Sequence, residues 1–438
     1  MRADDVAVTG LGLVTAAGTG AGEFWHTLCA GRSTARRDPA LAALPHTFSC
    51  RADGFEPERE LGGRLSRRLD RFTQLGLYAA QQAVLDAKLD PGTENAPASW
   101  APERVGVVLG VGSNSLDRYA PEFGRLAAGR PTKISPYALP RSVPNMAAGE
   151  VAIHLGCRGP NFVTSSACAS GATAIGVARD LLRSGTCDVV LTGGTESGLA
   201  PMAVAGFGQL GVLSRGGTDR GTDRGTDRGT DDGAYGSTDG STGRREPSCR
   251  PFDTARDGFV LGEGAAVLVL ESGAHARARC APVRALLRGY GASADAHHTT
   301  APHPEGRGAE QAVRSALADA GCTPGDIHHV NAHGTATVVG DAVEAAVLRR
   351  VFGEPPPVTA AKSITGHVLG ASGAIEAAAT VLSLQEQTVP PTANLAHPDP
   401  ALDLDVVAGR PRPVPMDAAL TSSFGFGGQN AVLVFTTA

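Results

Sequence analysis

Residues 161–182 read NFVTSSACASGATAIGVARDLL, a short apolar run that passes directly into a helical pattern of small and apolar residues. This pattern predicts a strand at Phe162–Thr164 and a helix whose first residues lie around Cys168. A thiol at a helix start is close to the positive end of the helix dipole and to unpaired backbone N–H groups, which lower its pKa and favour the thiolate. The small neighbouring residues leave room for a substrate. Cys168 is therefore a candidate nucleophile, and an inert cysteine in a tight turn is the alternative interpretation.

Around this segment, short apolar runs alternate with alanine-rich helical stretches, which is typical of a layered α/β fold. A helix is expected at Phe72–Ala87, where apolar and small residues recur at helical spacing. Buried strands are expected at Val6–Thr9, Val105–Leu109, Val189–Thr192, Ala265–Leu270, His329–Ala332 and Ala431–Phe435.

A faint internal repeat runs through the chain. AVLDAKLDP at 83–91 resembles ALADAGCTP at 316–324, and ASGA occurs at 169–172 and again at 371–374. Two halves of one fold would produce this pattern, and so would chance matches among Ala and Gly residues. If the repeat is structural, the first half carries roughly 30 additional residues, most easily between 112 and 149.

The overall composition excludes several classes of protein. The 438 residues include 39 basic and 44 acidic side chains, a balance that does not indicate a general nucleic-acid or membrane surface. The eight cysteines include no CxxC pair, which argues against a zinc ribbon or a disulfide scaffold. The sequence begins without a signal-peptide layout and no apolar run reaches about 18 residues, so we expect a cytoplasmic protein.

One stretch contains no residue that can join a core. Residues 215–232 repeat a glycine-rich, charge-balanced GTDR unit, and polar sequence continues to residue 248. Such a segment cannot offset its ordering entropy, so we expect a disordered insertion over 215–248. A tolerated surface expansion is the simpler interpretation, and a partner-binding loop is the alternative.

Two further motifs each centre on a histidine in a glycine-rich loop. NAHGTATVVGDAVE at 331–344 places His333 after a strand, and KSITGHVLGASGAIE at 362–376 places His367 at a loop-to-helix transition. SSFGFGGQN at 422–430 adds a turn whose backbone N–H groups could face a developing oxyanion. Two such histidines and a cysteine at a helix start are the groups that thiol acyl chemistry requires.

In order and spacing, these motifs resemble the β-ketoacyl-acyl carrier protein synthases, the elongating condensing enzymes of fatty acid and type II polyketide synthesis. The resemblance also includes VAVTGLGLVTAAG (6–18), RRLDRFTQLGLYAA (67–80) and PFDTARDGFVLGEGAAVLVLE (251–271), so it runs almost end to end. It implies a thiolase-type α/β fold, in which two similar halves form a five-layered α-β-α-β-α core with the site between the halves.

The resemblance places the catalytic groups in both halves. We expect an N-terminal half at 1–275 that contains Cys168, and a C-terminal half at 276–438 that contains His333 and His367. Cys168 matches the nucleophile that takes an acyl group from a carrier-protein thioester. The two histidines match those that bind the malonyl thioester carbonyl as CO2 leaves. The implied reaction is a decarboxylative Claisen condensation that gives a β-ketoacyl-carrier protein.

Other residues match supporting positions of the family. Lys362 resembles an active-site lysine that orders the site by pairing with acids at Glu344 and Glu376, and Phe426 matches the gating aromatic. The acyl oxyanion is expected on the backbone N–H groups of Cys168 and Phe426. The remaining matches are Asp341 as a supporting residue and Thr335 and Thr337 as pantetheine-binding residues.

The implied partner is an acyl carrier protein, which is acidic. An enzyme with a net charge of −5 then needs a local basic patch to receive it. RLSRRLDR at 64–71 places four arginines on one expected helix start, where we expect docking by Arg64, Arg67 and Arg68; a solvated helix face is the alternative. The resemblance also implies a homodimer, or a heterodimer with a chain-length-factor-like subunit. We expect no metal, nucleic acid or membrane partner, and no cofactor besides the phosphopantetheine arm that carries the substrates.

Other functions fit the sequence less well. TGLGLVTAAG has Thr15 where a dinucleotide fingerprint requires glycine, and Ser197 in GTESG stands one place late for a hydrolase elbow. A non-catalytic chain-length-factor-like subunit would lack the nucleophile, whereas Cys168 is present. The second motif has His367 where initiating synthases carry asparagine. A zinc site would have to draw on histidines whose spacing matches no closed tetrahedral pattern, namely His297, His298, His303, His328 and His329.

Overall fold

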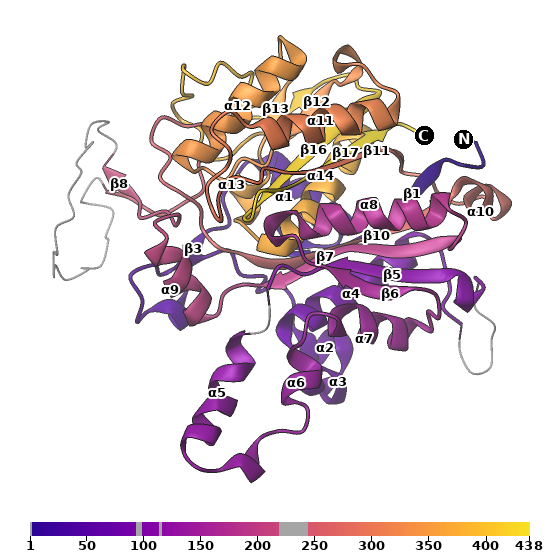
Figure 1. The fold of residues 1–438 in the computed structure, drawn as a ribbon, viewed down its shortest axis with the longest axis vertical. Coiled ribbons are helices and arrows are strands. Elements are labelled where there is room, and N and C mark those ends of the chain that lie inside the picture. The colour runs from indigo at the N-terminus through magenta and orange to yellow at the C-terminus, as the bar shows by residue number, and fades with distance from the viewer. Residues whose placement is uncertain (1, 93–98, 114–115, 219–243) are drawn as a thin grey trace.

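Helices and strands alternate in layers through the molecule, in the order α-β-α-β-α (Figure 1). The computed structural model describes residues 2–92, 99–113, 116–218 and 244–438. The first run of paired strands is β1 (Val6–Thr15), β10 (Glu263–Ser272), β7 (Val189–Ser197), β5 (Val105–Gly110) and β6 (Asn161–Thr164). The second is β11 (Ala285–Ala294), β17 (Gln429–Thr436), β16 (Ala418–Gly425), β12 (His329–Asn331) and β13 (Val358–Thr359).

The two runs of strands have the same topology. Numbered along the chain within its own half, each run has the order 1-5-4-2-3. The repeated strings lie at equivalent places: residues 83–91 end α4 (Arg71–Asp86), which packs on β1, and residues 316–324 end α11 (Arg307–Ala320), which packs on β11. The thiolase-type fold of two similar halves is thereby confirmed. β1 and β11 also pair with each other, which joins both runs into one 11-stranded mixed sheet.

The middle layer consists of α8 (Ser170–Arg183) and α14 (Ser372–Glu386), each of which begins in one copy of the repeated ASGA string. The two helices approach closely because glycine stands at both contacts. A Cβ at Gly171 would lie 2.8 Å from the backbone N of Ala374, and a Cβ at Gly373 would lie 2.9 Å from that of Ala172. The short turns η4 (Ala167–Ala169) and η6 (Leu369–Ala371), which precede these helices, therefore contact each other.

Other helices cover the outer faces of the sheet. α7 (Met146–Leu155) lies beside α4 on the first half, and α12 (Val338–Phe352) lies beside α11 on the second. The remaining helices and turns are α1 (Ala21–Ala30), η1 (Pro39–Leu41), α2 (Pro57–Leu61), α3 (Gly63–Arg68), η2 (Pro102–Arg104), α5 (Leu116–Ala127), η3 (Pro131–Lys133), α6 (Ala138–Ser142), α9 (Pro201–Gln209), α10 (Gly273–Ala278), η5 (Pro324–Asp326) and α13 (Lys362–Thr365). Short strands occur at β2 (Gly18–Thr19), β3 (Arg36–Arg37), β4 (Phe48–Ser49), β8 (Gly217–Thr218), β9 (Arg244–Arg245), β14 (Thr388–Val389) and β15 (Arg412–Pro413).

All the strands and the helix that apolar periodicity predicts are present, most of them longer than expected. β11 and β16 were not predicted, because their buried residues do not form an apolar run. β16 buries Thr421, Ser422 and Ser423, and glycines interrupt β11. The additional residues of the first half are also where they were expected, since α5, η3 and α6 lie between β5 and α7 and project from the body of the molecule (Figure 1).

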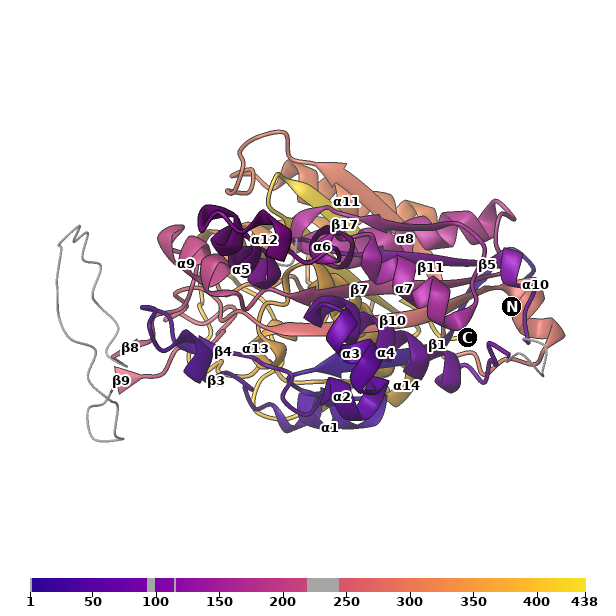
Figure 2. The ribbon, with the colours of Figure 1, turned by 90° about the horizontal axis from the view of Figure 1, so that it is seen from below.

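The two ends of the predicted insertion pair with each other as the antiparallel strands β8 and β9. They lie at the end of the molecule opposite the N-terminus (Figures 1 and 2). Ser248, the last residue of the expected disordered stretch, is buried, and its backbone N–H donates to Ser214 Oγ. The predicted range of 215–248 therefore extends too far at its C-terminal end. Residues 219–243 lie outside the described residues, and the disorder expected there stays a prediction.

The expected boundary between residues 275 and 276 falls inside α10, which packs on β1 and β10 of the first half. The second run of strands begins only at Ala285.

Among the described helices, none combines the length and the apolar character that crossing a bilayer requires.

Candidate active site

Cys168 lies in the η4 turn, between β6 and the start of α8, and its side chain is buried. The turn is tight, because the preceding Ala167 has a φ of 48°, a left-handed conformation that is costly for a residue with a Cβ. Burial raises the pKa of the Cys168 thiol to about 11, although the charge of Lys362 and the backbone N–H of Phe426, which donates to the sulfur, both lower it. The expectation of a lowered pKa is therefore wrong, because the loss of water around the sulfur outweighs the favourable groups near it.

His367 is held by the turn before α14. Its Nδ1 accepts a hydrogen bond from the backbone N–H of Leu369 (3.2 Å) and lies 3.0 Å from Ser372 Oγ. Ser372 Oγ itself accepts from the Val368 N–H, which leaves its proton free to donate to the ring. With Nδ1 acting as the acceptor, the neutral ring carries its proton on Nε2. Phe259 packs edge-on against the ring, with centroids 4.8 Å apart.

His333 is held by Lys362. The Lys362 ammonium donates to His333 Nδ1 (3.1 Å), to the His333 carbonyl oxygen (2.6 Å) and to Glu376 Oε1, so all its protons are used. His333 Nδ1 is thus an acceptor, and the proton of the neutral ring lies on Nε2, as in His367. Burial and the neighbouring Lys362 charge hold the pKa of both histidines well below the usual value. The site therefore contains two neutral imidazoles that can each donate from Nε2.

Lys362 pairs with only one of its two expected acids. Glu376 forms the ion pair, and burial raises the pKa of this carboxyl to about 7 against the opposing effect of Lys362. Glu344 instead accepts from the backbone N–H groups of His333 and Gly334, each at 2.8 Å, and from a serine hydroxyl. The expected Lys362–Glu344 pairing is corrected accordingly: Glu344 fixes the backbone of the His333 loop.

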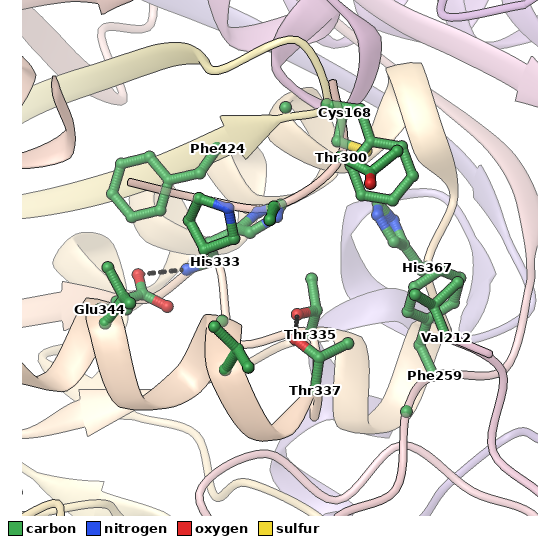
Figure 3. Close-up of a pocket in the computed structure, with 18 of the residues that line it drawn as sticks. Cys168, Val212, Phe259, Thr300, His333, Thr335, Thr337, Glu344, His367 and Phe424 are labelled. Atoms are coloured by element: carbon green, nitrogen blue, oxygen red, sulfur yellow. Dashed lines mark hydrogen bonds between the residues drawn. The ribbon is translucent and has the colours of Figure 1, made fainter. Parts of the chain in front are cut away.

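Asp341 and the two threonines shape the same loop. Asp341 accepts from the backbone N–H groups of Phe252 and Ala336, and burial raises the pKa of its carboxyl to about 7. Thr335 and Thr337 face the cavity with their hydroxyls 2.9 Å apart (Figure 3). The loop after β12 is therefore held in place by hydrogen bonds from its backbone to two buried acids of α12, Asp341 and Glu344.

Most of the predicted catalytic and substrate-binding residues line one cavity of about 410 Å³. Figure 3 shows that Cys168, His333 and His367 face the same space, with the threonines at its edge. A second cavity, of about 340 Å³, is also lined by Cys168 and has a mostly apolar lining that includes Leu116, Ala203 and Leu369. Phe426 and Phe207 line both cavities. Three predicted residues do not line the first cavity, namely Lys362, Glu376 and Asp341.

Several residues of the site were not predicted from the sequence. Phe207, Phe259 and Thr300 line the first cavity, and Glu196 binds the loops behind it. Phe207 and Thr300 come from segments without a recognised motif. Glu196 belongs to GTESG, where the serine at the end of β7 is the residue that resembles a known motif and the glutamate carries no signal of its own.

The predicted arginines do not share one helix. Arg64, Arg67 and Arg68 are exposed on α3, whereas Arg71 begins α4 and makes an ion pair with the buried Glu263. Arg71 therefore supports the fold, and only the three arginines of α3 form an accessible group. The rejected zinc histidines also separate: His329 is buried in β12, while the rings of His297 and His303 lie 5.0 Å apart on an exposed loop.

A buried thiol next to two neutral N–H donors, on a fold of two thiolase-like halves, defines the class of thiol-dependent acyltransferases. Two family models match the chain: Beta-ketoacyl synthase, N-terminal domain, over residues 3–276, and Beta-ketoacyl synthase, C-terminal domain, over residues 284–396. The chain belongs to the beta-ketoacyl synthase family. It is an acyltransferase that performs beta-ketoacyl-carrier protein condensation in fatty acid or polyketide synthesis.

Relatives match over almost the whole chain. The 3-oxoacyl-[acyl-carrier-protein] synthase 2 of Staphylococcus aureus (strain COL) is 38% identical over 435 residues, which are 98% of this chain and 97% of the relative. The solved structure of the ishigamide ketosynthase/chain length factor has a TM-score of 0.85 and 32% identity, with 99% of both chains covered. A type II PKS acyl-carrier protein in complex with its ketosynthase has a TM-score of 0.83 and 29% identity, again with 99% of both chains covered.

The raised pKa of Cys168 predicts how its reactivity depends on pH. Because the thiol is neutral near pH 7, its alkylation by iodoacetamide should accelerate about tenfold per pH unit up to about pH 10, without a plateau. Lys362→Met should slow the reaction at each pH, because the ammonium lowers the pKa of the thiol. The measurement is the rate of mass addition to the Cys168 peptide. A plateau near pH 7 would show a thiol that is already ionised and would contradict a pKa raised by burial.

Proposed function

We propose that Cys168 carries the growing acyl chain. The observation that supports this most is that Cys168 lines both a cavity with two N–H donors and an apolar cavity. In the first step Cys168 Sγ attacks the thioester carbonyl of an acyl-carrier protein, and the bond between that carbonyl and the pantetheine sulfur breaks. The thiol proton of Cys168 leaves with the pantetheine thiol. The Phe426 N–H, which already points at the sulfur, and the Cys168 N–H stabilise the oxyanion.

The apolar cavity then holds the acyl chain while the first cavity receives the malonyl arm. In support of this, the polar groups that could bind a pantetheine arm, Thr335 and Thr337, face only the first cavity. Phe426 and Phe207 line both cavities, with their rings 6.3 Å apart, so they separate the two substrates. Phe426 is thus suited to the gating role that the sequence suggested.

Decarboxylation follows at the two histidines. When the bond to the malonyl carboxylate breaks, its electron pair delocalises onto the thioester carbonyl, and the Nε2–H groups of His333 and His367 donate to the developing oxyanion. The resulting carbanion attacks the acyl carbonyl on Cys168, and the C–S bond breaks. The released thiolate takes up a proton from solvent water, which its raised pKa favours. A neutral imidazole suits this role, because the hydrogen bonds at Nδ1 keep the proton on Nε2 and burial keeps the ring uncharged.

Substitutions separate the two half-reactions. Cys168→Ala should abolish acyl transfer, and acyl-carrier protein should add an acyl mass to the wild-type protein at Cys168 alone. His333→Ala or His367→Ala should reduce CO2 release from malonyl-carrier protein by about 100- to 1,000-fold, the typical effect of removing one such donor, while acylation of Cys168 survives in part. Acylation at another cysteine, or CO2 release within about threefold of wild type in both histidine variants, would contradict these roles.

The alternative role, a non-catalytic chain-length-factor-like subunit, is less well supported, because the nucleophile and both histidines are present and share a cavity. A cytoplasmic location stays a prediction from the sequence.

We also propose that an acyl carrier protein docks on α3. Arg64 has no acidic partner within 4 Å among the described residues, and Arg67 lies 3.6 Å from Glu58 in an exposed pair. Arg68, in contrast, pairs at 2.6 Å with Glu150, whose side chain is buried. Arg64 and Arg67 are therefore the side chains most available to an acidic partner.

Charge reversal tests this surface. Arg64→Glu with Arg67→Glu should raise the KM for carrier-bound substrate by about two- to thirtyfold, because each exposed pair contributes about 0.2 to 1 kcal/mol, and should weaken its salt dependence. A small pantetheine thioester should still acylate Cys168 at the normal rate. Arg158→Glu, which reverses another exposed arginine outside α3, is the matched control. Equal impairment with both substrates would mean that the arginines support the fold instead.

A second subunit is proposed for the free edge of the sheet. Among the described strands, β6 pairs only with β5, so its outer edge is unpaired, and Phe162 is exposed on it. The neighbouring α7, α6 and α5 expose Ile153, Leu139 and Phe123. An unpaired edge next to exposed large apolar residues favours association with another chain. Two of the structural relatives are a ketosynthase together with a chain length factor. By analogy, either a second copy of this chain or a homologous subunit is a suitable occupant of this edge.

This assembly is testable by sedimentation. Phe162→Lys should shift the assembled protein to the monomer, because a charge would be buried at the edge of β6. A wild-type protein that stays monomeric both alone and in the native purified fraction would contradict the proposal.

A further inference from the structure

Glu196, near the end of β7, is a buried carboxylate that has no part in the steps above. It accepts four hydrogen bonds. Oε2 accepts from the backbone N–H groups of Gly112 (2.8 Å), Ser113 (3.2 Å) and Gly370 (3.3 Å), and Oε1 accepts from Ser113 Oγ (2.9 Å). One side chain thus collects donors from two loops that are far apart in the sequence.

The two loops belong to different parts of the site. Gly112 and Ser113 follow β5 and line the apolar cavity beside Cys168. Gly370 lies in the η6 turn, and the preceding Leu369 lines the same cavity while its N–H donates to His367 Nδ1. Glu196 therefore connects the wall of the acyl cavity to the turn that sets the orientation of the His367 ring.

The geometry leaves no substitute for this carboxylate. A Cβ at Gly370 would lie 2.2 Å from the backbone N of Gly112, so the two loops are in direct contact with no space for another group between them. Their N–H groups point at the same oxygen. Without that acceptor, the buried N–H of Gly370 and the partly buried N–H groups of Gly112 and Ser113 would lose their partner, and the loops would have to separate to let water reach them.

We propose that Glu196 is a positioning residue that sets both the wall of the acyl cavity and the orientation of His367. The inference rests on the proposed function, because it assigns the apolar cavity to the acyl chain and decarboxylation to His367. It predicts that one side chain, which touches neither substrate, affects acyl chain-length preference and CO2 release together.

The experiment compares four variants in two assays. The first assay measures acylation of Cys168 by acyl-carrier proteins of increasing chain length, and the second measures CO2 release from malonyl-carrier protein. Glu196→Ala removes all four acceptor contacts. Glu196→Gln retains an oxygen for the backbone N–H groups and can donate to Ser113 Oγ with its amide. Ser113→Ala removes only the hydroxyl contact to Oε1, on the side of the acyl cavity, and keeps the backbone contacts of both loops. Thr192→Val, on the same strand, is the control, because the Thr192 hydroxyl is buried without a hydrogen-bond partner among the described residues.

Glu196→Ala should reduce CO2 release by about 10- to 100-fold, the scale of a misplacement of about 1 Å at a reacting group, and should shift the preferred acyl chain length. Glu196→Gln should restore most of both properties. Ser113→Ala should shift chain-length preference while lowering CO2 release less than Glu196→Ala does. Thr192→Val should match wild type in both assays.

Two results would overturn the inference: a folded Glu196→Ala variant that matches wild type in both assays, or a uniform loss of rate with an unchanged chain-length profile. If Glu196→Ala does not fold, an unchanged chain-length profile in Ser113→Ala overturns it. A wild-type protein that neither acylates Cys168 nor releases CO2 would instead refute the proposed function, so the two failures are distinguishable.

Discussion

The close contact between α8 and α14 is the constraint on which the active site depends. Glycines at 171 and 373 let the two helices approach until the backbone of one meets the backbone of the other. Each helix begins in a turn that carries a left-handed residue, Ala167 with a φ of 48° and Leu369 with a φ of 43°. Because the helices touch, these turns touch as well. The thiol of one half is thereby brought to the histidine turn of the other without any long loop.

Burial determines the chemistry of the groups that this contact assembles. It raises the pKa of the Cys168 thiol and lowers the pKa of both histidines, so the resting site holds neutral groups. The fixed charge is the Lys362 ammonium, which is paired with Glu376 and directs its other protons to His333. Hydrogen bonds to Nδ1 in each ring then decide which nitrogen carries the proton. The site is preorganised for donation, because Lys362 orients the His333 ring, and Ser372 and the Leu369 N–H orient the His367 ring.

Much of this arrangement is predictable from the sequence, and the reasons differ between parts. The strands of the first half form apolar runs, and the ASGA strings mark both middle helices, so local pattern was sufficient there. β16 was not predictable in this way, because Ser422 and Ser423 are buried with polar side chains. The raised pKa of Cys168 was missed because a helix start is visible in the sequence and burial is not. Glu196 was missed for a similar reason: its partners are mostly backbone N–H groups, which leave no trace in residue identity.

The equivalence of the two halves has a further consequence at the turns before α8 and α14. Aligning the ASGA strings puts Gly370 at the position that Cys168 occupies in the first half. There the backbone of Gly112 leaves no room for a side chain, since a Cβ at Gly370 would lie 2.2 Å from its nitrogen. The two equivalent turns therefore have room for one thiol and not for two. The second turn carries no thiol there, and its Leu369 and Gly370 N–H groups bind His367 and Glu196 instead, so two equivalent turns of a nearly symmetric fold have different roles in one asymmetric site.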